Sequence, residues 1–173
     1  MTTTTMAMTV RDAAYRQRLR EAYLELSRCF PDYFVTLVTN RSNLPGERLS
    51  HMSLDQFHRA VRDFHKRIDT ALLGSRASRK PRSQRTNGLM FVEHAGRNIH
   101  GHAFVRFADQ NNRTLTGLQL ICNDAWAAIC PGGDVLVQAQ YDGGPGLYPS
   151  KELERRGYDF DQTILFSTFV SQD

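Results

Sequence analysis

Apolar residues recur at spacings of three and four in several parts of the chain, a period typical of helices with one buried face. This period predicts helices over Thr9–Arg28, Thr114–Ile129 and Leu147–Arg156. The most regular stripe follows Ser53, which starts a capping box with Gln56. Its members are Leu54, Phe57, Val61, Phe64, Ile68 and Leu72. His58 and His65 lie at the edges of this stripe, two turns or about 10 Å apart, and are therefore too distant to share one metal ion.

Other segments alternate between apolar and polar residues or are rich in β-branched and aromatic residues, as strands are. Leu89–Val92 and Ala103–Phe107 flank a polar turn at Ala95–Asn98 and are predicted to form a β-hairpin. The other predicted strands are Tyr33–Thr39, Asp134–Tyr141 and Thr163–Val170. This order of elements predicts an α+β fold with a central, antiparallel five-stranded sheet and helices packed against it.

The length of 173 residues suits one domain, which we expect over residues 9–173 after a disordered N-terminus at residues 1–8. No apolar run approaches the ~20 residues that span a bilayer, so no membrane partner is expected. The first residues carry no secretory signal pattern, and the three cysteines form no CxxC pair. A cytoplasmic protein with reduced core cysteines is the expectation.

The net charge is +4, and its distribution is uneven. Between Gly74 and Asn87 the chain has five cations and no acidic residue. We call this stretch the basic segment, and we expect a loop that can contact a phosphate backbone or serve as a plain solvated connection. Its cations are Arg76, Arg79, Lys80, Arg82 and Arg85.

Three residues of the predicted hairpin have the chemistry of metal ligands. His100 and His102 are two residues apart on one strand, so their side chains point to the same face. Glu93 lies near the turn on the partner strand and can face the same two imidazoles. Two ring nitrogens and one carboxylate suit a divalent metal ion with open coordination positions. The alternative is a surface strand that carries two histidines by chance.

A candidate nucleophile follows the glycine-rich stretch at 143–146. Tyr148 and Lys151 are three residues apart, so they share one face of the predicted helix, and Pro149 suits its first turn. A tyrosine phenol titrates near pH 10 and needs a nearby base, cation or metal-bound phosphate to attack at neutral pH. Tyr141, on the preceding strand, is a second candidate. The plain alternative is a packed tyrosine beside a solvent-exposed lysine.

The order of these features resembles the endonuclease domain of rolling-circle replication initiators, the single-tyrosine branch of the HUH superfamily. Phe34–Thr39 resembles the first motif of that family, an apolar strand with threonines. Ile99–Val105 resembles the second, with two metal-binding histidines, and Tyr148–Lys151 resembles the third, YxxK. The resemblance covers roughly residues 33–157. It implies the Rep-like fold of this superfamily, in which the sheet has an RRM-like topology.

The resemblance also implies a function and roles for the residues. Glu93, His100 and His102 would hold Mg²⁺ or Mn²⁺, and Tyr148 would attack a phosphate of single-stranded DNA at a replication origin. The products would be a 5′-phosphotyrosine link and a free 3′-hydroxyl, and a reversal of this step would rejoin DNA. Lys151 would position or screen charge. Unwinding would require a separate helicase, and the cations of the basic segment would contact phosphates.

The sequence departs from the family at Gly101, where a bulky apolar residue is usual between the two histidines. Three other functions stay open. A single-tyrosine transposase of the same superfamily would act as a dimer. A non-catalytic single-stranded nucleic-acid-binding module would be indifferent to divalent metal. A metal-dependent phosphoesterase that uses water would form no covalent adduct.

Overall fold

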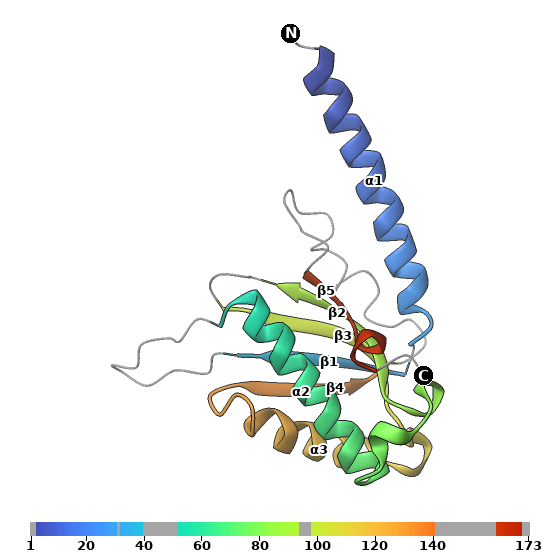
Figure 1. Cartoon of the computed structure of the whole chain (residues 1–173), viewed down its shortest axis with the longest axis vertical. Helices are drawn as coiled ribbons and strands as arrows, with labels where there is room; N and C mark the ends of the chain where they lie inside the picture. The colour runs from blue at the N-terminus through green and yellow to red at the C-terminus, as the bar shows by residue number, and fades with distance from the viewer. Residues whose placement is uncertain (1–2, 31, 40–51, 94–97, 141–161, 171–173) are drawn as a thin grey trace, which may run out of the picture.

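The structure, a computed structural model, describes residues 3–30, 32–39, 52–93, 98–140 and 162–170. Five strands form one sheet in the order β4-β1-β3-β2-β5, and every neighbouring pair is antiparallel (Figure 1). The strands are β1 (Tyr33–Val38), β2 (Asn87–Glu93), β3 (His100–Arg106), β4 (Asp134–Ala139) and β5 (Thr163–Leu165). The α-helices are α1 (Thr3–Ser27), α2 (Leu54–Leu73) and α3 (Leu115–Ala127). The predicted α+β fold with a five-stranded antiparallel sheet is confirmed.

Two split βαβ units build most of this sheet. Helix α2 connects β1 to β2, with β3 inserted between them, and α3 connects β3 to β4, with β1 inserted between them. This is the βαββαβ arrangement that the RRM-like topology implies, with β5 added beside β2. The arrangement brings the end of β1, the end of β2 and the start of β3 to the same edge of the molecule.

Helices α2 and α3 cover one face of the sheet, which we call the helix face. Strand side chains alternate, so Val35, Leu37, Val92 and Ala103 point toward these helices and are almost fully buried. The apolar stripe predicted for α2 packs against them, and the capping box of Ser53 and Gln56 is formed as predicted.

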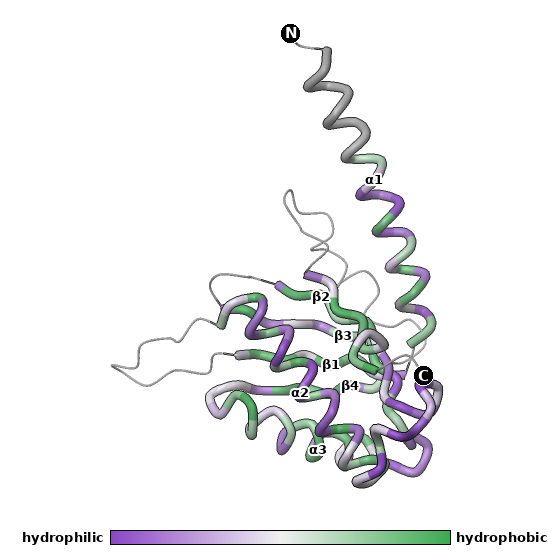
Figure 2. The backbone as a smooth tube through the Cα atoms, in the orientation of Figure 1, coloured by the Kyte–Doolittle hydropathy of each residue, from purple (hydrophilic) through white to green (hydrophobic). Residues whose placement is uncertain are grey.

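The opposite face, which we call the open face, is covered at one end by the last turns of α1. Tyr23 and Leu26 pack there against a second core cluster, and the ring of Tyr23 meets that of Phe91 edge to face at 6.0 Å. The buried members of this cluster are Phe30, Phe34, Leu89, Phe91 and Phe104. Toward its N-terminus α1 projects away from the sheet (Figure 1). Hydrophobic and hydrophilic residues alternate along its described lower part (Figure 2).

The largest differences between predicted and observed bounds lie near the two ends of the described chain. Thr163–Val170 was expected to be one strand, but β5 ends at Leu165 and a 3₁₀ turn occupies Phe166–Phe169. The turn lets both phenylalanines, three residues apart and so on one face, pack on His65 of α2. The first helix starts at Thr3 rather than Thr9. Residues 3–8 contain no glycine or proline, and extending an existing helix costs little.

Two further expectations concern the state of the cysteines and the presence of a membrane-spanning helix. Cys122 and Cys130 are buried, and burial raises the pKa of Cys122 to about 12, while Cys29 is exposed just after α1. All three cysteines are free. Among the described residues, no helix combines the length and the apolar character that crossing a membrane requires.

Candidate metal centre

Strand pairing brings the three predicted metal ligands together on the open face. Glu93, the last residue of β2, is the direct register partner of His100, the first residue of β3. His102 lies two residues further along β3, and the alternation of the strand turns it to the same face as His100. The prediction that these three side chains converge is confirmed. We call this group the triad.

The triad is compact and largely buried. One ligand atom from each residue lies within 4.8 Å of the others. The Nε2 atoms of His100 and His102 lie 3.4 and 3.7 Å from the two carboxylate oxygens of Glu93. Glu93 is 2% exposed and His102 8%, whereas His100 is half-buried. A buried carboxylate that faces two ring nitrogens is costly unless a cation compensates its charge, and a divalent metal ion supplies such compensation. The residues therefore fit a metal ion.

Hydrogen bonds to the outer ring nitrogens orient both imidazoles. His100 Nδ1 lies 2.9 Å from the carbonyl oxygen of Asn98, which can only accept, so Nδ1 carries the proton and donates. In the neutral ring, Nε2 of His100 then keeps its lone pair, which is the form that binds metal. His102 Nδ1 lies 3.0 Å from the hydroxyl of Thr36 on β1. Neither partner could be recognised from the sequence pattern.

Gly101 separates the two histidines and points to the helix face. A Cβ atom at this position would lie 2.6 Å from Sδ of Met90 and 3.1 Å from Cζ of Phe57 on α2. A side chain here would therefore require the end of the Met90 side chain on β2 to move and the ring of Phe57 to shift slightly. The close approach of Phe57 and Met90 explains why glycine suits this position.

The basic segment folds as two 3₁₀ turns, at Ala77–Arg79 and Arg82–Gln84, between α2 and β2. The residues of this segment are largely hydrophilic (Figure 2). Four of its predicted phosphate contacts are exposed, namely Arg76, Arg79, Lys80 and Arg82. The segment joins β2 at Asn87, and Glu93 is six residues further along that strand, or about 20 Å. The exposed cations therefore lie beyond the opposite end of β2 from the triad.

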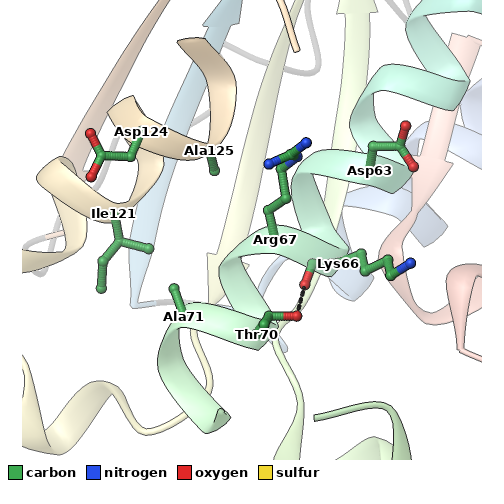
Figure 3. Close-up of a pocket in the computed structure, with 8 residues that line it drawn as sticks. All are labelled: Asp63, Lys66, Arg67, Thr70, Ala71, Ile121, Asp124 and Ala125. Atoms are coloured by element: carbon green, nitrogen blue, oxygen red, sulfur yellow. Dashed lines mark hydrogen bonds between the residues drawn. The ribbon is translucent and has the colours of Figure 1, made fainter. Parts of the chain in front are cut away.

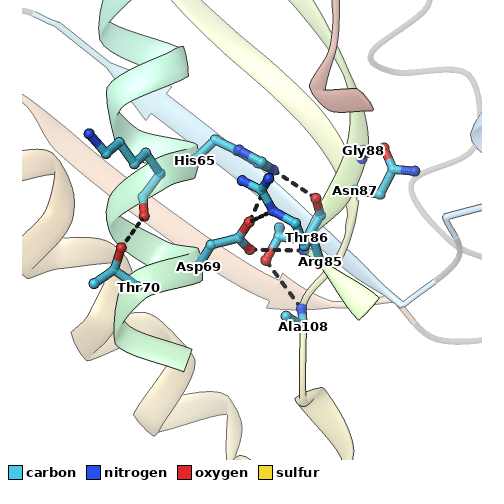
Figure 4. Close-up of polar contacts among 9 residues, drawn as sticks. His65, Asp69, Thr70, Arg85, Thr86, Asn87, Gly88 and Ala108 are labelled. Carbon is cyan, nitrogen blue, oxygen red and sulfur yellow. Dashed lines mark hydrogen bonds and ion pairs between the residues drawn. The ribbon is translucent and has the colours of Figure 1, made fainter. Parts of the chain in front are cut away.

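Arg85 differs from the other four cations, because its side chain is only 9% exposed. Its Nε donates to Oδ2 of Asp69 at 2.7 Å, and the Thr86 backbone N–H donates to Oδ1 of the same carboxylate at 2.9 Å. His65 Nε2 donates to the Thr86 carbonyl at 2.7 Å, and the Ala108 N–H donates to the Thr86 hydroxyl (Figure 4). We call these residues the clamp. Arg85 thus belongs to the scaffold rather than to a phosphate-binding surface.

The clamp also corrects the expectation for His65, which is 1% exposed and not at an edge of the helix stripe. Burial lowers the pKa of His65 from its ordinary value of 6.5, and the nearby carboxylate of Asp69 opposes this shift. The sequence pattern alone does not single out Asp69 as a functional or structural partner. Its position four residues after His65 on the apolar side of α2 was the available signal.

A cavity of about 530 Å³ lies between α2 and α3, away from the triad (Figure 3). The charged residues of its lining are Asp63, Lys66, Arg67 and Asp124. Carboxylates and cations thus occur there in equal number. Among the described residues, those that line the cavity include no His or Cys, and the group of possible metal ligands lies elsewhere, at the triad.

Tyr148, Lys151 and Tyr141 lie outside the described residues, so their predicted roles stay predictions. Tyr23 is the described tyrosine that packs on the open face near the triad, through Phe91, the register partner of His102. Burial raises the pKa of Tyr23. This shift disfavours the phenolate that a tyrosine nucleophile requires.

Comparison with known proteins yields no relative. No model of a protein family, no curated protein and no solved structure matches the chain. The fold and the geometry of the triad are therefore the observations that bear on function.

Proposed function

We propose that the protein is a metal-dependent endonuclease that nicks and rejoins single-stranded DNA through a tyrosine nucleophile, in the manner of HUH replication initiators. The observation that carries this proposal is the convergence of Glu93, His100 and His102 on the open face of a βαββαβ sheet. The order of the three sequence motifs adds the reaction class.

The donor set supports a divalent cation as cofactor. Two imidazoles and one carboxylate leave coordination positions open, and a phosphate oxygen of DNA can take one of them. We propose Mg²⁺ or Mn²⁺ as the ion. Its contribution when bound would be to polarise the scissile phosphate and to stabilise the charge that develops there.

The protein side chains would perform the transfer itself. Tyr148 Oη forms a bond to phosphorus while the bond from phosphorus to the 3′ oxygen breaks. The phenol proton passes to solvent, and the departing oxygen takes a proton to become a free 3′-hydroxyl. Lys151 would hold negative charge near the reacting phosphate. Because the phosphotyrosine ester replaces one phosphodiester bond, the 3′-hydroxyl of a DNA strand can reverse the step.

The exposed cations of the basic segment would bind a more distant part of the same DNA. They lie about 20 Å along β2 from Glu93. Arg76, Arg79, Lys80 and Arg82 would each neutralise a phosphate there, which makes binding depend on salt. A replication origin and a separate helicase are the partners that this role requires.

The test is formation of a covalent adduct with labelled single-stranded oligonucleotides from the replicon of the protein, with Mn²⁺ or with EDTA. Denaturing gels would compare the wild type with Tyr148→Phe, Glu93→Gln and Tyr23→Phe. We expect an adduct with Mn²⁺ in the wild type and in Tyr23→Phe, and none with EDTA or in the other two variants. Tyr23→Phe is the matched control, because it also removes a phenol hydroxyl near the triad.

Other outcomes would support the competing functions. Cleavage without an adduct would indicate a phosphoesterase that uses water. Binding that is indifferent to metal and to Tyr148→Phe, across several origins, would indicate a non-catalytic binding module. An obligate dimer that joins two different DNA ends would favour the transposase.

A further inference from the structure

Strand β1 contributes one polar contact to the metal centre, the hydroxyl of Thr36. Thr36 is the direct register partner of His102 on β3, and both side chains point to the open face. Directly opposed side chains of an antiparallel pair have Cβ atoms about 5 Å apart, so a short hydroxyl can reach the imidazole. Thr36 Oγ1 lies 3.0 Å from His102 Nδ1.

We propose that Thr36 is a positioning residue that fixes the ring orientation of His102, accepts the Nδ1 proton in a hydrogen bond when a metal ion takes Nε2, and thereby raises the affinity of the triad for a divalent metal ion. The inference deepens the proposed function and rests on its metal centre, but it does not require DNA cleavage. Thr36 itself would touch neither the ion nor DNA.

The two ring nitrogens of His102 face different partners. Nε2 faces Glu93 at 3.7 Å, inside the triad, and Nδ1 faces Thr36 outside it. A metal ion needs the lone pair of Nε2, and the proton of the neutral ring must then be on Nδ1. The Thr36 hydroxyl can donate to an unprotonated Nδ1 and can accept from a protonated one, so it keeps its hydrogen bond when a metal ion takes Nε2 and holds the ring in the same orientation.

The ring plane of His102 is fixed from a second direction. Phe34, two residues before Thr36 on β1, stacks on the imidazole with centroids 5.5 Å apart and planes 11° apart. The stack limits tilting of the ring, whereas the hydrogen bond limits its rotation within that plane. Stacking offers no acceptor to the Nδ1 proton of the metal-bound ring, so that proton depends on the Thr36 hydroxyl.

His100 provides an internal comparison. Its Nδ1 donates to the backbone carbonyl of Asn98, a partner that can only accept and that side-chain substitution leaves in place. The orientation of His100 therefore depends on the backbone, and that of His102 depends on a side chain from a different strand. Substitution of Thr36 should disturb one ligand of the triad and spare the other.

The experiment measures metal binding alone, with Zn²⁺ as the probe, because imidazole binds Zn²⁺ well. Calorimetric titrations would compare the wild type with Thr36→Val, which keeps the shape but lacks the hydroxyl, and Thr36→Ser, which keeps the hydroxyl. Thr114→Val is the stability control, since the Thr114 hydroxyl caps α3 far from the triad. We expect roughly 10- to 100-fold weaker binding in Thr36→Val. Thr36→Ser and Thr114→Val should bind like the wild type.

Nitrogen-edited proton NMR of the Zn²⁺-loaded protein gives a second readout. The wild type and Thr36→Ser should show slowly exchanging Nδ1 protons from both histidines. In Thr36→Val, the His102 proton should exchange quickly, while the His100 proton stays protected by Asn98. This contrast would not arise from general loosening of the sheet, because loosening would affect both rings.

The results distinguish failure of this inference from failure of the metal centre. Wild-type affinity in Thr36→Val, or equal weakening in Thr36→Ser and Thr36→Val, would overturn the role of the hydroxyl and leave the triad intact. Absence of Zn²⁺ binding by the wild type would overturn both the metal centre and the inference.

Discussion

The triad and the clamp both combine histidine with a carboxylate in the interior, yet they have different chemistry. In the triad, two imidazoles direct their Nε2 atoms at Glu93 at 3.4 and 3.7 Å. In the clamp, His65 Nε2 donates to the Thr86 carbonyl, and both oxygens of Asp69 accept hydrogen bonds shorter than 3 Å. The polar atoms of the clamp form hydrogen bonds with one another and with nearby backbone groups, whereas the ligand atoms of the triad face one another.

The positions of the two clusters explain this difference. The clamp lies on the helix face, where α2, the end of the basic segment and the start of β2 meet, and backbone groups are at hand. The triad lies on the open face, where the outer nitrogens of both rings contact Asn98 and Thr36 and the inner nitrogens face Glu93. A cluster of histidines and a carboxylate is thus a candidate metal site when hydrogen bonds hold the outer ring nitrogens and the inner nitrogens face the carboxylate.

The largest expected effect is a loss of stability when the clamp is broken. Asp69→Asn removes the charge that compensates Arg85 and leaves a buried guanidinium and its neighbours poorly paired. We expect a loss of about 3–5 kcal/mol in the free energy of unfolding, measured by urea denaturation. A loss below about 1 kcal/mol would mean that the clamp does not hold the basic segment to α2.

Glu93→Gln in the triad should weaken metal binding but change the stability of the metal-free protein little. Without metal, we expect little loss of stability, because the substitution removes a buried charge. With Mn²⁺ at 100 times its dissociation constant, the wild type should gain about 2.7 kcal/mol in unfolding free energy, and the variant should lose most of that gain. Thermal unfolding with and without Mn²⁺ checks this, and an equal gain in the variant would argue against Glu93 as a ligand.

His65 should make stability depend on pH in a stated direction. Its pKa in the folded protein is below the ordinary value of 6.5, so the unfolded chain binds the proton more readily. The contribution of His65 to the free energy of unfolding is therefore complete above pH 6.5. It falls as the pH drops from 6.5 toward the pKa of His65 in the folded protein, by at most about 1.4 kcal/mol per pH unit. Urea denaturation of the wild type and His65→Gln from pH 7.5 to 5.5 should show the difference in their unfolding free energies changing in that range. Parallel curves would exclude this role.

The smallest expected effect on stability distinguishes two arginines of the basic segment. Arg82→Gln changes an exposed side chain and should alter stability by less than about 0.5 kcal/mol. If Arg82 contacts one phosphate of single-stranded DNA, the salt dependence of binding should fall by about 0.7 in log–log slope. Arg85→Gln is the matched control and should mainly lower stability. The same effect of both variants on the salt slope would contradict the separation of the two roles.

Much of the fold could be predicted from local patterns. The stripe of α2, its capping box and the β2–β3 hairpin depend on residues close in sequence, and all three are confirmed. The convergence of the triad could also be predicted, because alternation along one hairpin decides it. The predicted strand at Thr163–Val170 was wrong beyond Leu165, since Phe166 and Phe169 turn to pack on His65, a contact with a distant helix.

The supporting residues depend on contacts that local patterns do not contain. Thr36 reaches His102 across 66 positions, through a strand register that the sequence did not specify. Asp69 looked like a polar residue beside an apolar stripe, and Arg85 looked like the other cations of the basic segment. Asp69 and Arg85 pair because the fold brings α2 next to the start of β2, a contact between segments that the sequence pattern does not contain.

The most direct test of the central claim is crystallographic. A crystal of the protein soaked in Mn²⁺ would be measured for anomalous scattering, with a crystal of His102→Ala treated in the same way. We expect one strong anomalous peak in the wild type, bonded to the Glu93 carboxylate and to Nε2 of His100 and His102, and its loss or marked weakening in the variant. A wild-type crystal with no peak between these three side chains would contradict the account.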